Sequence, residues 1–262
     1  MNQLQELHSR FVALRMPTAR QVVSEVIQAA HNDDWSYEDY TRELLDQELE
    51  GRRQRRIERF MKSSQLPPGK TLHSYDAKRL SPRLRRVLTQ LCTGEFLDRG
   101  DNVLVFGLPG RGKTHFAAAV GFELILLGRS VYFSPAFKIV DRLQRAKRDL
   151  ELERELRLLD RFELLILDDF GYVQQNRHEM EVLFTLLAER YERRSLLITS
   201  NLVFSEWDRI FLDPLTTQSA IDRVVHHSVI VEFGNDMTSV RADEALARQK
   251  AEPTPAAPDE TA

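Results

Sequence analysis

Five short apolar runs recur along the second two-thirds of the chain. They lie near residues 102–106, 130–134, 163–168, 195–199 and 228–233, and stretches with helical spacing separate them; a further helix is expected at 81–97. Strands that are apolar at nearly every position and alternate with helices are typical of a parallel sheet covered on both faces. The pattern therefore predicts an α/β domain with a five-stranded parallel sheet.

The first 64 residues follow a helical pattern instead. Apolar residues keep helical spacing up to Leu14, Pro17 interrupts the pattern, and it resumes from Val22. Ser36 is the expected N-cap of a long third helix, and residues 65–69 are rich in turn formers. We therefore expect a small all-α N-terminal domain at 1–64, a linker at 65–80, the α/β domain at 81–241 and a disordered acidic tail at 242–262.

A glycine-rich loop follows the first apolar run. It matches the pattern G-x-x-x-x-G-K-[ST], which predicts a nucleotide site where a strand leads into a helix, although a chance glycine-rich turn is the alternative. Glycines let backbone N–H groups face a phosphate, and the helix start adds its dipole. Lys113 would reach the β- and γ-phosphates of ATP, and Thr114 would bind Mg²⁺. The candidate nucleotide-binding residues are Gly107, Leu108, Pro109, Gly110, Arg111, Gly112, Lys113, Thr114 and His115.

Polar residues end two later runs. Asp168 is the candidate ligand of Mg²⁺, directly or through water, and Asp169 would orient or deprotonate the water that attacks the γ-phosphate. The two acids could instead be an N-cap for the next helix. Asn201 would hydrogen-bond the γ-phosphate or its attacking water as a sensor of nucleotide state, or it could be a turn residue. The order of these residues and their shared position at strand ends favour a catalytic site.

Composition says little about partners. The formal net charge of -3 hides a segregated distribution, with cations crowded at 52–62 and acids in the tail from residue 251. The single cysteine, Cys92, cannot form an intramolecular disulfide, and the sequence shows neither a signal peptide nor an apolar run long enough to span a bilayer. We therefore expect a cytoplasmic protein with no membrane partner.

Several short motifs in a fixed order carry a family resemblance. They read Gly-Lys-Thr-His at 112–115, Leu-Asp-Asp-Phe-Gly-Tyr at 167–172, Glu-Arg-Tyr at 189–191, Leu-Ile-Thr-Ser-Asn-Leu at 197–202, Glu-Trp at 206–207 and Ala-Ile-Asp-Arg-Val-Val-His-His at 220–227. This set closely resembles the IstB-like AAA+ ATPases, which assist transposition by insertion sequences and are relatives of the DnaC helicase loader. Stretches at 16–18, 35–40, 55–59 and 70–76 are similar to the same family's helical domain and linker.

The resemblance implies a P-loop AAA+ three-layer fold and a Mg-dependent ATPase. Such a protein binds double-stranded DNA, assembles on it with ATP and recruits or activates a partner transposase. The resemblance also implies a homo-oligomer with ATP sites between subunits, in which Arg223 would be an arginine finger on the neighbour's γ-phosphate. An intramolecular salt bridge of Arg223 with Asp222 or Glu232 is the alternative. The alternative function is a DnaC-like replicative helicase loader that uses ATP as a switch.

Three residues depart from the family's pattern. Arg111 stands where a small residue or Thr is commoner, Asp169 replaces the usual Glu, and Val240 replaces a tyrosine. The shorter Asp169 side chain leads us to expect slow hydrolysis. Arg241 matches a family motif only in part, and a second sensor role for it is a hypothesis.

Cations between the second and third strands are candidates for DNA contact. In the DnaA/DnaC/IstB group an extra helix here faces the DNA path, and cations at near-helical spacing would neutralise phosphates without reading sequence. The alternative is a solvated helix with intrahelical pairs, such as Arg148 or Lys147 with Glu151. The candidate DNA-binding residues are Lys138, Arg142, Arg145 and Arg148 in this segment, and Arg52, Arg53, Arg55 and Arg56 in the N-terminal domain.

Overall fold

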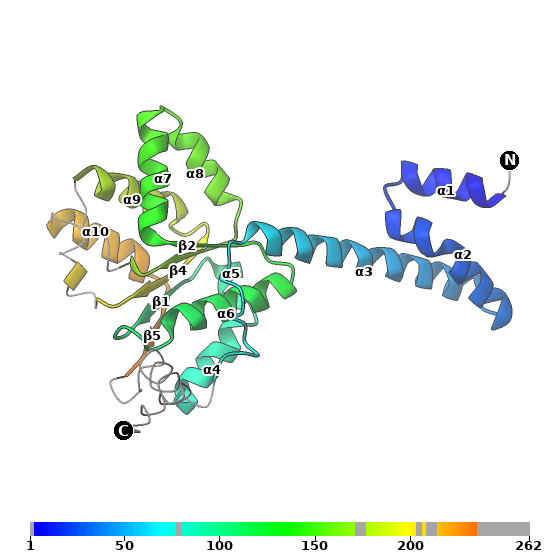
Figure 1. The fold of residues 1–262 in the computed structure, drawn as a ribbon, viewed down its shortest axis with the longest axis horizontal. Helices are drawn as coiled ribbons and strands as arrows, with labels where there is room; N and C mark the ends of the chain where they lie inside the picture. The colour runs from blue at the N-terminus through cyan, green and yellow to red at the C-terminus, as the bar shows by residue number, and fades with distance from the viewer. Residues whose placement is uncertain (1–2, 77–79, 171–176, 203–205, 208–213, 235–262) are drawn as a thin grey trace, which may run out of the picture. The chain divides into compact units, whose positions relative to one another are not determined.

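The computed structural model of the protein describes residues 3–76, 80–170, 177–202, 206–207 and 214–234 (Figure 1). The chain divides into two compact units, Met1–Lys62 and Ser63–Ala262. The first is helical, and the second contains a parallel sheet. Within the described residues, no helix has both the length and the apolar character that crossing a bilayer requires.

Three helices begin in the first unit: α1 (Gln3–Ala13), α2 (Pro17–Asn32) and α3 (Tyr37–Ser63). Pro17 is the first residue of α2, where its missing N–H group has no helical partner to lose. Ser36 accepts a hydrogen bond from the backbone N–H of Asp39 (3.1 Å), as expected of an N-cap. The helices pack around a small core of Ala19, Val23 and Leu44.

Glu48 of α3 caps the start of α2. Met16, the N-cap residue of α2, makes no capping hydrogen bond with its side chain. Oε2 of Glu48 instead accepts hydrogen bonds from the backbone N–H groups of Thr18 (2.8 Å) and Ala19 (3.0 Å). Burial acts to raise the pKa of Glu48, but hydrogen bonds from Arg52 and from these two N–H groups outweigh it and hold the pKa below its usual value. This buried carboxylate therefore fastens α3 to α2.

The second unit is built on the sheet that the apolar runs predict. Its strands are β1 (Asn102–Phe106), β2 (Val131–Pro135), β3 (Leu164–Asp168), β4 (Ser195–Ser200) and β5 (Ser228–Glu232). They are all parallel, in the order β2-β3-β4-β1-β5. The predicted α/β fold with a five-stranded parallel sheet is therefore confirmed. Strand β4 lies between the strand that leads into the glycine-rich loop and the strand that ends in the carboxylates.

Helices cover both faces of this sheet (Figure 1). On one side lie α4 (Pro82–Leu91) and α6 (Lys113–Leu126), and on the other lie α7 (Ala136–Arg148), α8 (Leu152–Asp160), α9 (Arg177–Arg190) and α10 (Pro214–Val225). Leu165 and Leu167 of β3 are buried in the core shared with the second group. Ile166, between them, packs beside Gly121 of α6. Because both faces are covered, every position of β3 is apolar until the final carboxylate.

The helix expected at 81–97 is in fact two helices. α4 ends at Leu91 and α5 (Glu95–Arg99) follows, because Gly94 has a φ of 79°, a left-handed conformation that a continuous helix does not contain. The hydroxyl of Thr93 also donates a hydrogen bond to the carbonyl of Gln90 (2.8 Å). Apolar spacing continues through both helices, so it does not reveal the break.

Candidate nucleotide-binding site

The glycine-rich loop joins the carboxyl end of β1 to the start of α6. Gly110 and Gly112 have φ values of 80° and 90°, which residues with side chains rarely adopt. The buried ammonium of Lys113 donates hydrogen bonds to the carbonyls of Gly107 (2.7 Å) and Leu108 (3.1 Å) and so closes the loop on itself. The result is a tight loop at the N-terminus of a 14-residue helix, a setting in which backbone N–H groups can surround a phosphate.

Asp168 lies beside this loop, between two threonine hydroxyls. Thr114, in the first turn of α6, donates a hydrogen bond to Oδ2 (3.0 Å), and Thr199 of β4 donates one to Oδ1 (2.6 Å). Thr199 also accepts a hydrogen bond from the backbone N–H of Asp169 (2.9 Å). The structure therefore brings together Thr114 and Asp168, the two residues that the sequence suggests as magnesium ligands.

Burial raises the pKa of Asp168 above its ordinary value. Hydrogen bonds from Thr199 and Thr114 and the charge of Lys70 act in the opposite direction, while the charge of Asp169 adds to the rise. A bound cation would relieve this burial of negative charge. Carboxylate and hydroxyl oxygens are the hard ligands that Mg²⁺ prefers, so the residues present fit a magnesium ion held together with nucleotide phosphates.

Asp169 and Asn201 lie at the ends of neighbouring strands. Asp169 is half-buried and has a φ of 55°, a strained value for a residue other than glycine. Residues 171–176, which follow these acids, lie outside the described residues, so the alternative of a helix N-cap stays open. Asn201 directly follows β4, whose last carbonyl accepts a hydrogen bond from the N–H of Gly107 (3.3 Å). Oδ1 of Asn201 is buried and has no hydrogen-bond partner within the described ranges, which suits a group that binds a ligand.

The segment 69–76 packs against the start of α6. Nε2 of His115 lies 3.1 Å from the carbonyl oxygen of Thr71 and 3.2 Å from the hydroxyl of Ser74. The His115 ring meets the ring of Tyr75 edge-on, with 4.8 Å between centroids. Burial raises the pKa of Tyr75, whose hydroxyl lies beside Gly112. His115 thus holds this segment next to the loop, and its predicted contact with the nucleotide stays a prediction.

Two residues of this site were not predicted. Thr199 links Asp168 to Asp169, and its sequence signal is its place in the Leu-Ile-Thr-Ser-Asn-Leu motif, two positions before Asn201. Lys70 acts on Asp168 through its charge, and nothing in the local sequence indicates that a residue so distant along the chain comes near. Of the motif residues in the sequence, Gly171, Tyr172, Val240 and Arg241 lie outside the described residues.

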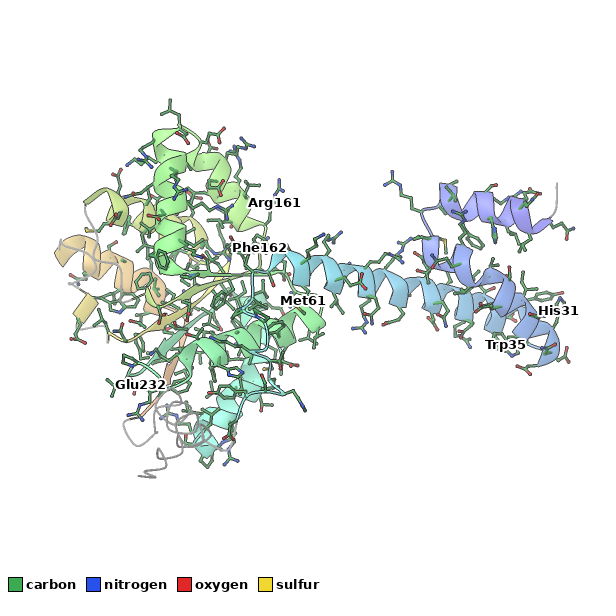
Figure 2. All side chains as sticks on the ribbon, in the orientation of Figure 1. His31, Trp35, Met61, Arg161, Phe162 and Glu232 are labelled. Atoms are coloured by element: carbon green, nitrogen blue, oxygen red, sulfur yellow. The ribbon has the colours of Figure 1, made fainter. Side chains whose placement is uncertain are left out.

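Arg223 lies at the end of the sheet away from the glycine-rich loop, where the strands begin. It is in the last turn of α10, and the backbone carbonyl that follows it accepts a hydrogen bond from the side chain of Asn102, the first residue of β1 (3.1 Å). The guanidinium carbon lies 4.6 Å from the ring centroid of Phe184, and Nη1 is buried without a hydrogen-bond partner in the described part of the chain. The structure shows no ion pair of Arg223 with Asp222 or with Glu232, which is at the far end of β5 (Figure 2).

The candidate DNA-binding cations of α7 differ in their contacts. Arg142 is paired with Glu155 and donates a hydrogen bond to the hydroxyl of Tyr132 (3.0 Å). Lys138 and Arg148 are exposed, and neither forms an ion pair with any residue that the structure describes. Arg145 is 71% exposed and lies 4.0 Å from a carboxylate oxygen of Asp141. Glu151, the suggested intrahelical partner, pairs with Arg154 instead. Lys147 pairs with Glu181. The side chains more available for contact with DNA are therefore Lys138, Arg145 and Arg148.

The cations of α3 are largely engaged within the first unit. Arg52 and Arg55 both bind Glu48, at 2.9 and 3.2 Å, and Arg53 binds Glu50 at 2.8 Å. Arg56 is exposed, without an ion pair to a described residue. Arg52 and Arg55 therefore have a structural role in addition to any contact with DNA.

The sequence has clear relatives over almost its whole length. The family described as IstB-like ATP binding protein matches residues 9–246. An insertion-sequence ATP-binding protein of Sinorhizobium fredii is 40% identical over 245 residues, which cover 93% of this chain and 82% of the relative. The insertion sequence IS21 ATP-binding protein of Pseudomonas aeruginosa is 35% identical over 233 residues, which cover 89% and 87% of the two chains.

Solved structures share the fold over most of the chain. AMPPCP-bound DnaA from Aquifex aeolicus matches with a TM-score of 0.53 at 18% identity, over 72% of this chain and 57% of that chain. The DnaC helicase loader matches with a TM-score of 0.51 at 18% identity, over 67% of this chain and 99% of that chain. These likenesses establish the P-loop AAA+ fold. With the glycine-rich loop, the carboxylates and the relatives in agreement, the chain belongs to the IstB-like ATP-binding family.

Proposed function

We propose that this protein is an ATP-hydrolysing, DNA-binding helper of insertion-sequence transposition. In this proposal it assembles on double-stranded DNA in its ATP-bound form and recruits or activates a partner transposase. Its relatives are named as insertion-sequence ATP-binding proteins, which supports the process, and the loop around Lys113 supports the nucleotide.

Each polar residue of the site has a part in the proposed reaction. Lys113 binds the β- and γ-phosphate oxygens, while Thr114 and Asp168 hold Mg²⁺, which supplies charge neutralisation to the phosphates when it is bound. Asp169 takes the proton of the attacking water, and Thr199 fixes the backbone of Asp169 for this task. The unpaired Oδ1 of Asn201 accepts a hydrogen bond from the same water, or its side-chain N–H group donates one to the γ-phosphate.

The observation that carries the proposal is the distance between Arg223 and the loop. The loop follows the last residue of β1, whereas Arg223 is tied to the first, so about 16 Å of strand separates them at about 3.3 Å per residue over five residues. This separation favours a role at the loop of a neighbouring subunit over a role at the loop of its own chain. Arg223 is partly exposed and its charge has no carboxylate partner among the described residues, which supports an anion from outside the chain, such as the phosphate of a neighbouring subunit, as its ligand.

Mixing two inactive variants tests this arrangement. Arg223→Ala should bind ATP nearly normally yet lose about 10³-fold or more in turnover, and Lys113→Ala should not bind ATP. A mixture of the two should regain activity, because an intact loop then meets an intact arginine. Arg193→Ala is the matched control, since Arg193 lies in the α9–β4 turn and is paired with Asp160 (3.1 Å). Hydrolysis that does not depend on protein concentration, or Arg223→Ala with full turnover, would exclude an arginine acting between subunits.

A helicase loader is the second candidate, favoured by the shared fold with the DnaC helicase loader. The two functions differ in the protein partner. A transposase encoded beside this chain should bind it in the presence of ATP and DNA, whereas binding to a replicative helicase alone would support the loader.

A further inference from the structure

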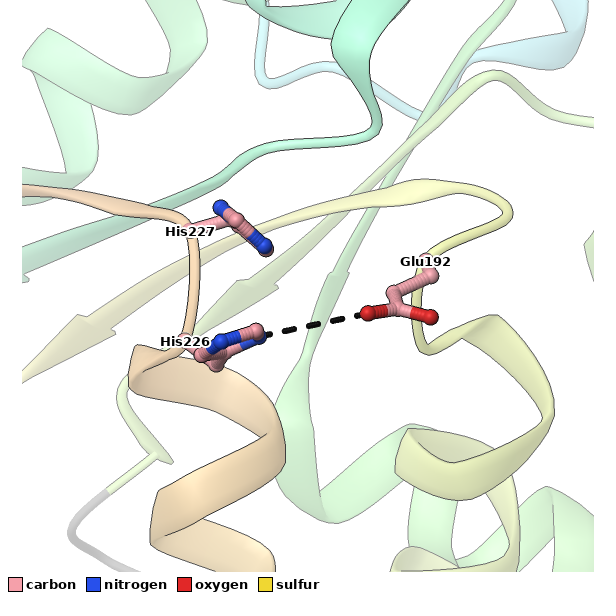
Figure 3. A group of neighbouring side chains, drawn as sticks. All are labelled: Glu192, His226 and His227. Atoms are coloured by element: carbon pink, nitrogen blue, oxygen red, sulfur yellow. Dashed lines mark ion pairs between the residues drawn. The ribbon is translucent and has the colours of Figure 1, made fainter.

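Three exposed side chains with metal-binding atoms lie close together (Figure 3). They precede strands β4 and β5, at the end of the sheet away from the glycine-rich loop that follows β1. Glu192 follows α9, and His226 and His227 follow α10. Each offers one ligand atom, and these atoms all lie within 4.8 Å of one another. Within the described residues, this is the one group of three or more His, Cys, Asp or Glu side chains with such an arrangement.

The backbone brings these side chains together at a conformational cost. Glu192 has a φ of 55° and His227 a φ of 59°, left-handed values that residues other than glycine rarely adopt. Consecutive side chains of an extended strand point to opposite faces, but the rings of His226 and His227 lie with their centroids 4.0 Å apart. Figure 3 shows His226 directed toward Glu192, with Nδ1 4.0 Å from Oε1.

One buried residue holds both turns in place. The side chain of Asn102 accepts a hydrogen bond from the N–H of Leu196, after the α9–β4 turn, and donates one to the carbonyl of Val224, before the α10–β5 turn. The backbone N–H of Asn102 donates a further hydrogen bond to the carbonyl of His227 (3.0 Å). The three ligand-bearing positions are thus fixed to the same point of β1, which is the support that a preorganised site needs.

We propose that Glu192, His226 and His227 form a binding site for a divalent transition-metal ion of the Zn²⁺ class. Two imidazoles and one carboxylate are ligands that suit zinc and its neighbours rather than Mg²⁺ or Ca²⁺. Tetrahedral ligand atoms about 2.1 Å from one ion lie about 3.4 Å apart. The 4.0 Å between Oε1 of Glu192 and Nδ1 of His226 is close to this value, and rotations of the exposed side chains would bring the ligand atoms to it.

The bound ion would link the α9–β4 turn to the α10–β5 turn. All three side chains are exposed, so an ion can enter from solvent and a water molecule can complete its coordination. The Tyr191 hydroxyl lies 3.1 Å from Nδ1 of His226, a contact that an ion bound to this nitrogen would replace.

Direct zinc binding tests the site without any reading of ATP turnover. The full chain without a histidine tag is titrated with Zn²⁺ against a chromophoric chelator, with Mg²⁺ in excess so that the carboxylates near the loop do not contribute. We expect one strong site per chain, weakened at least about tenfold by His226→Asn, by His227→Asn and by Glu192→Gln. His31→Asn, a change of an exposed histidine in α2, should leave the affinity as it is.

Thermal unfolding supplies the second measurement. Zn²⁺ should raise the unfolding midpoint of the parent protein and of His31→Asn but not of the His226→Asn/His227→Asn double variant, while all three should have similar midpoints without metal. Absence of zinc binding by the parent would overturn the proposal. Unchanged affinity in the double variant would overturn it as well, because the ion would then be bound elsewhere.

Discussion

Asp168 combines a poor environment for a free carboxylate with a good environment for a cation. Its folded-state pKa is raised above the ordinary value by burial, so the folded protein without nucleotide binds a proton more tightly than the unfolded chain does. Protonated Asp168 therefore adds to the stability of the fold below its unfolded pKa, and this contribution is lost as the pH rises through the folded pKa. At neutral pH the ionised carboxylate therefore lowers the stability of the protein.

Asp168→Asn should consequently have opposite effects on stability and on binding. The nucleotide-free variant should unfold at a higher temperature than the parent at pH 7.5, because it removes the buried charge while its amide oxygen can accept from Thr199 and its N–H group can donate to the Thr114 hydroxyl. Saturating Mg²⁺-ATP at about 100 times its Kd should stabilise the parent by about 2.7 kcal/mol and the variant far less. Asp169→Asn is the control, since it should retain the ATP-dependent shift and lose turnover. A lower midpoint for nucleotide-free Asp168→Asn would contradict the interpretation.

At the scale of elements, the junction of α2 and α3 depends on a single carboxylate. Glu48→Gln removes the buried negative charge that pairs with Arg52 and Arg55, and it replaces one carboxylate oxygen by an amide group. The N–H groups in the first turn of α2 then have a weaker acceptor. We expect the change to lower the stability of this junction by about 1–3 kcal/mol. Hydrogen exchange of residues 17–32 by mass spectrometry should accelerate by about tenfold for each 1.4 kcal/mol. Glu58→Gln, an exposed change on the same helix, should have little effect.

The same junction should weaken in acid. Because the folded-state pKa of Glu48 is lowered, its contribution is present above the unfolded value of 4.5 and is lost as the pH falls through the folded pKa. Exchange in α2 corrected for intrinsic rates should rise over that range in the parent, and the rise should be smaller in Glu48→Gln. Equal acid sensitivity of the two proteins would show that other carboxylates control the junction.

At the scale of the whole molecule, binding to duplex DNA should be an electrostatic process. It should be largely independent of sequence, stronger with ATP and steeply weakened by salt, because displaced counterions then gain less entropy. Lys138, Arg145 and Arg148 are the cleanest probes on α7, since Arg142 is already held by Glu155. Changing all three to Glu should reduce the slope of log K against log salt by roughly 3, at about 0.9 for each phosphate contact.

The matched control lies on the other face of the sheet. Arg83, Arg85 and Arg86 of α4 are three exposed arginines, and their change to Glu alters the net charge by the same amount. Fluorescence anisotropy on two unrelated duplexes with ATP present measures both triple variants. An equal loss in the two variants would mean that net charge and not the α7 surface matters. No binding at low salt would leave a protein-client adaptor as the better account.

The sequence by itself determined the parts of this protein that local pattern encodes. Strand positions follow from continuous apolar runs, and the glycine-rich loop with Lys113 and Thr114 is contiguous in sequence, so its chemistry can be read without a fold. The family also follows from short ordered motifs, and the comparisons confirm it. Each of these signals spans only a few residues, and that is why neighbouring residues were sufficient to predict them.

Tertiary structure decided what depends on the order of strands in the sheet. Because β4 lies between β1 and β3, Thr199 reaches both Asp168 and Asp169, a contact across 30 residues that no local pattern indicates. Helix α10 runs antiparallel to β1. Arg223, His226 and His227 therefore lie near the first residue of β1, at the end of the sheet away from the glycine-rich loop. Side-chain pairing also separated cations that are alike in sequence, such as Arg142 and Arg148, because an ion pair requires a partner that only the folded chain supplies.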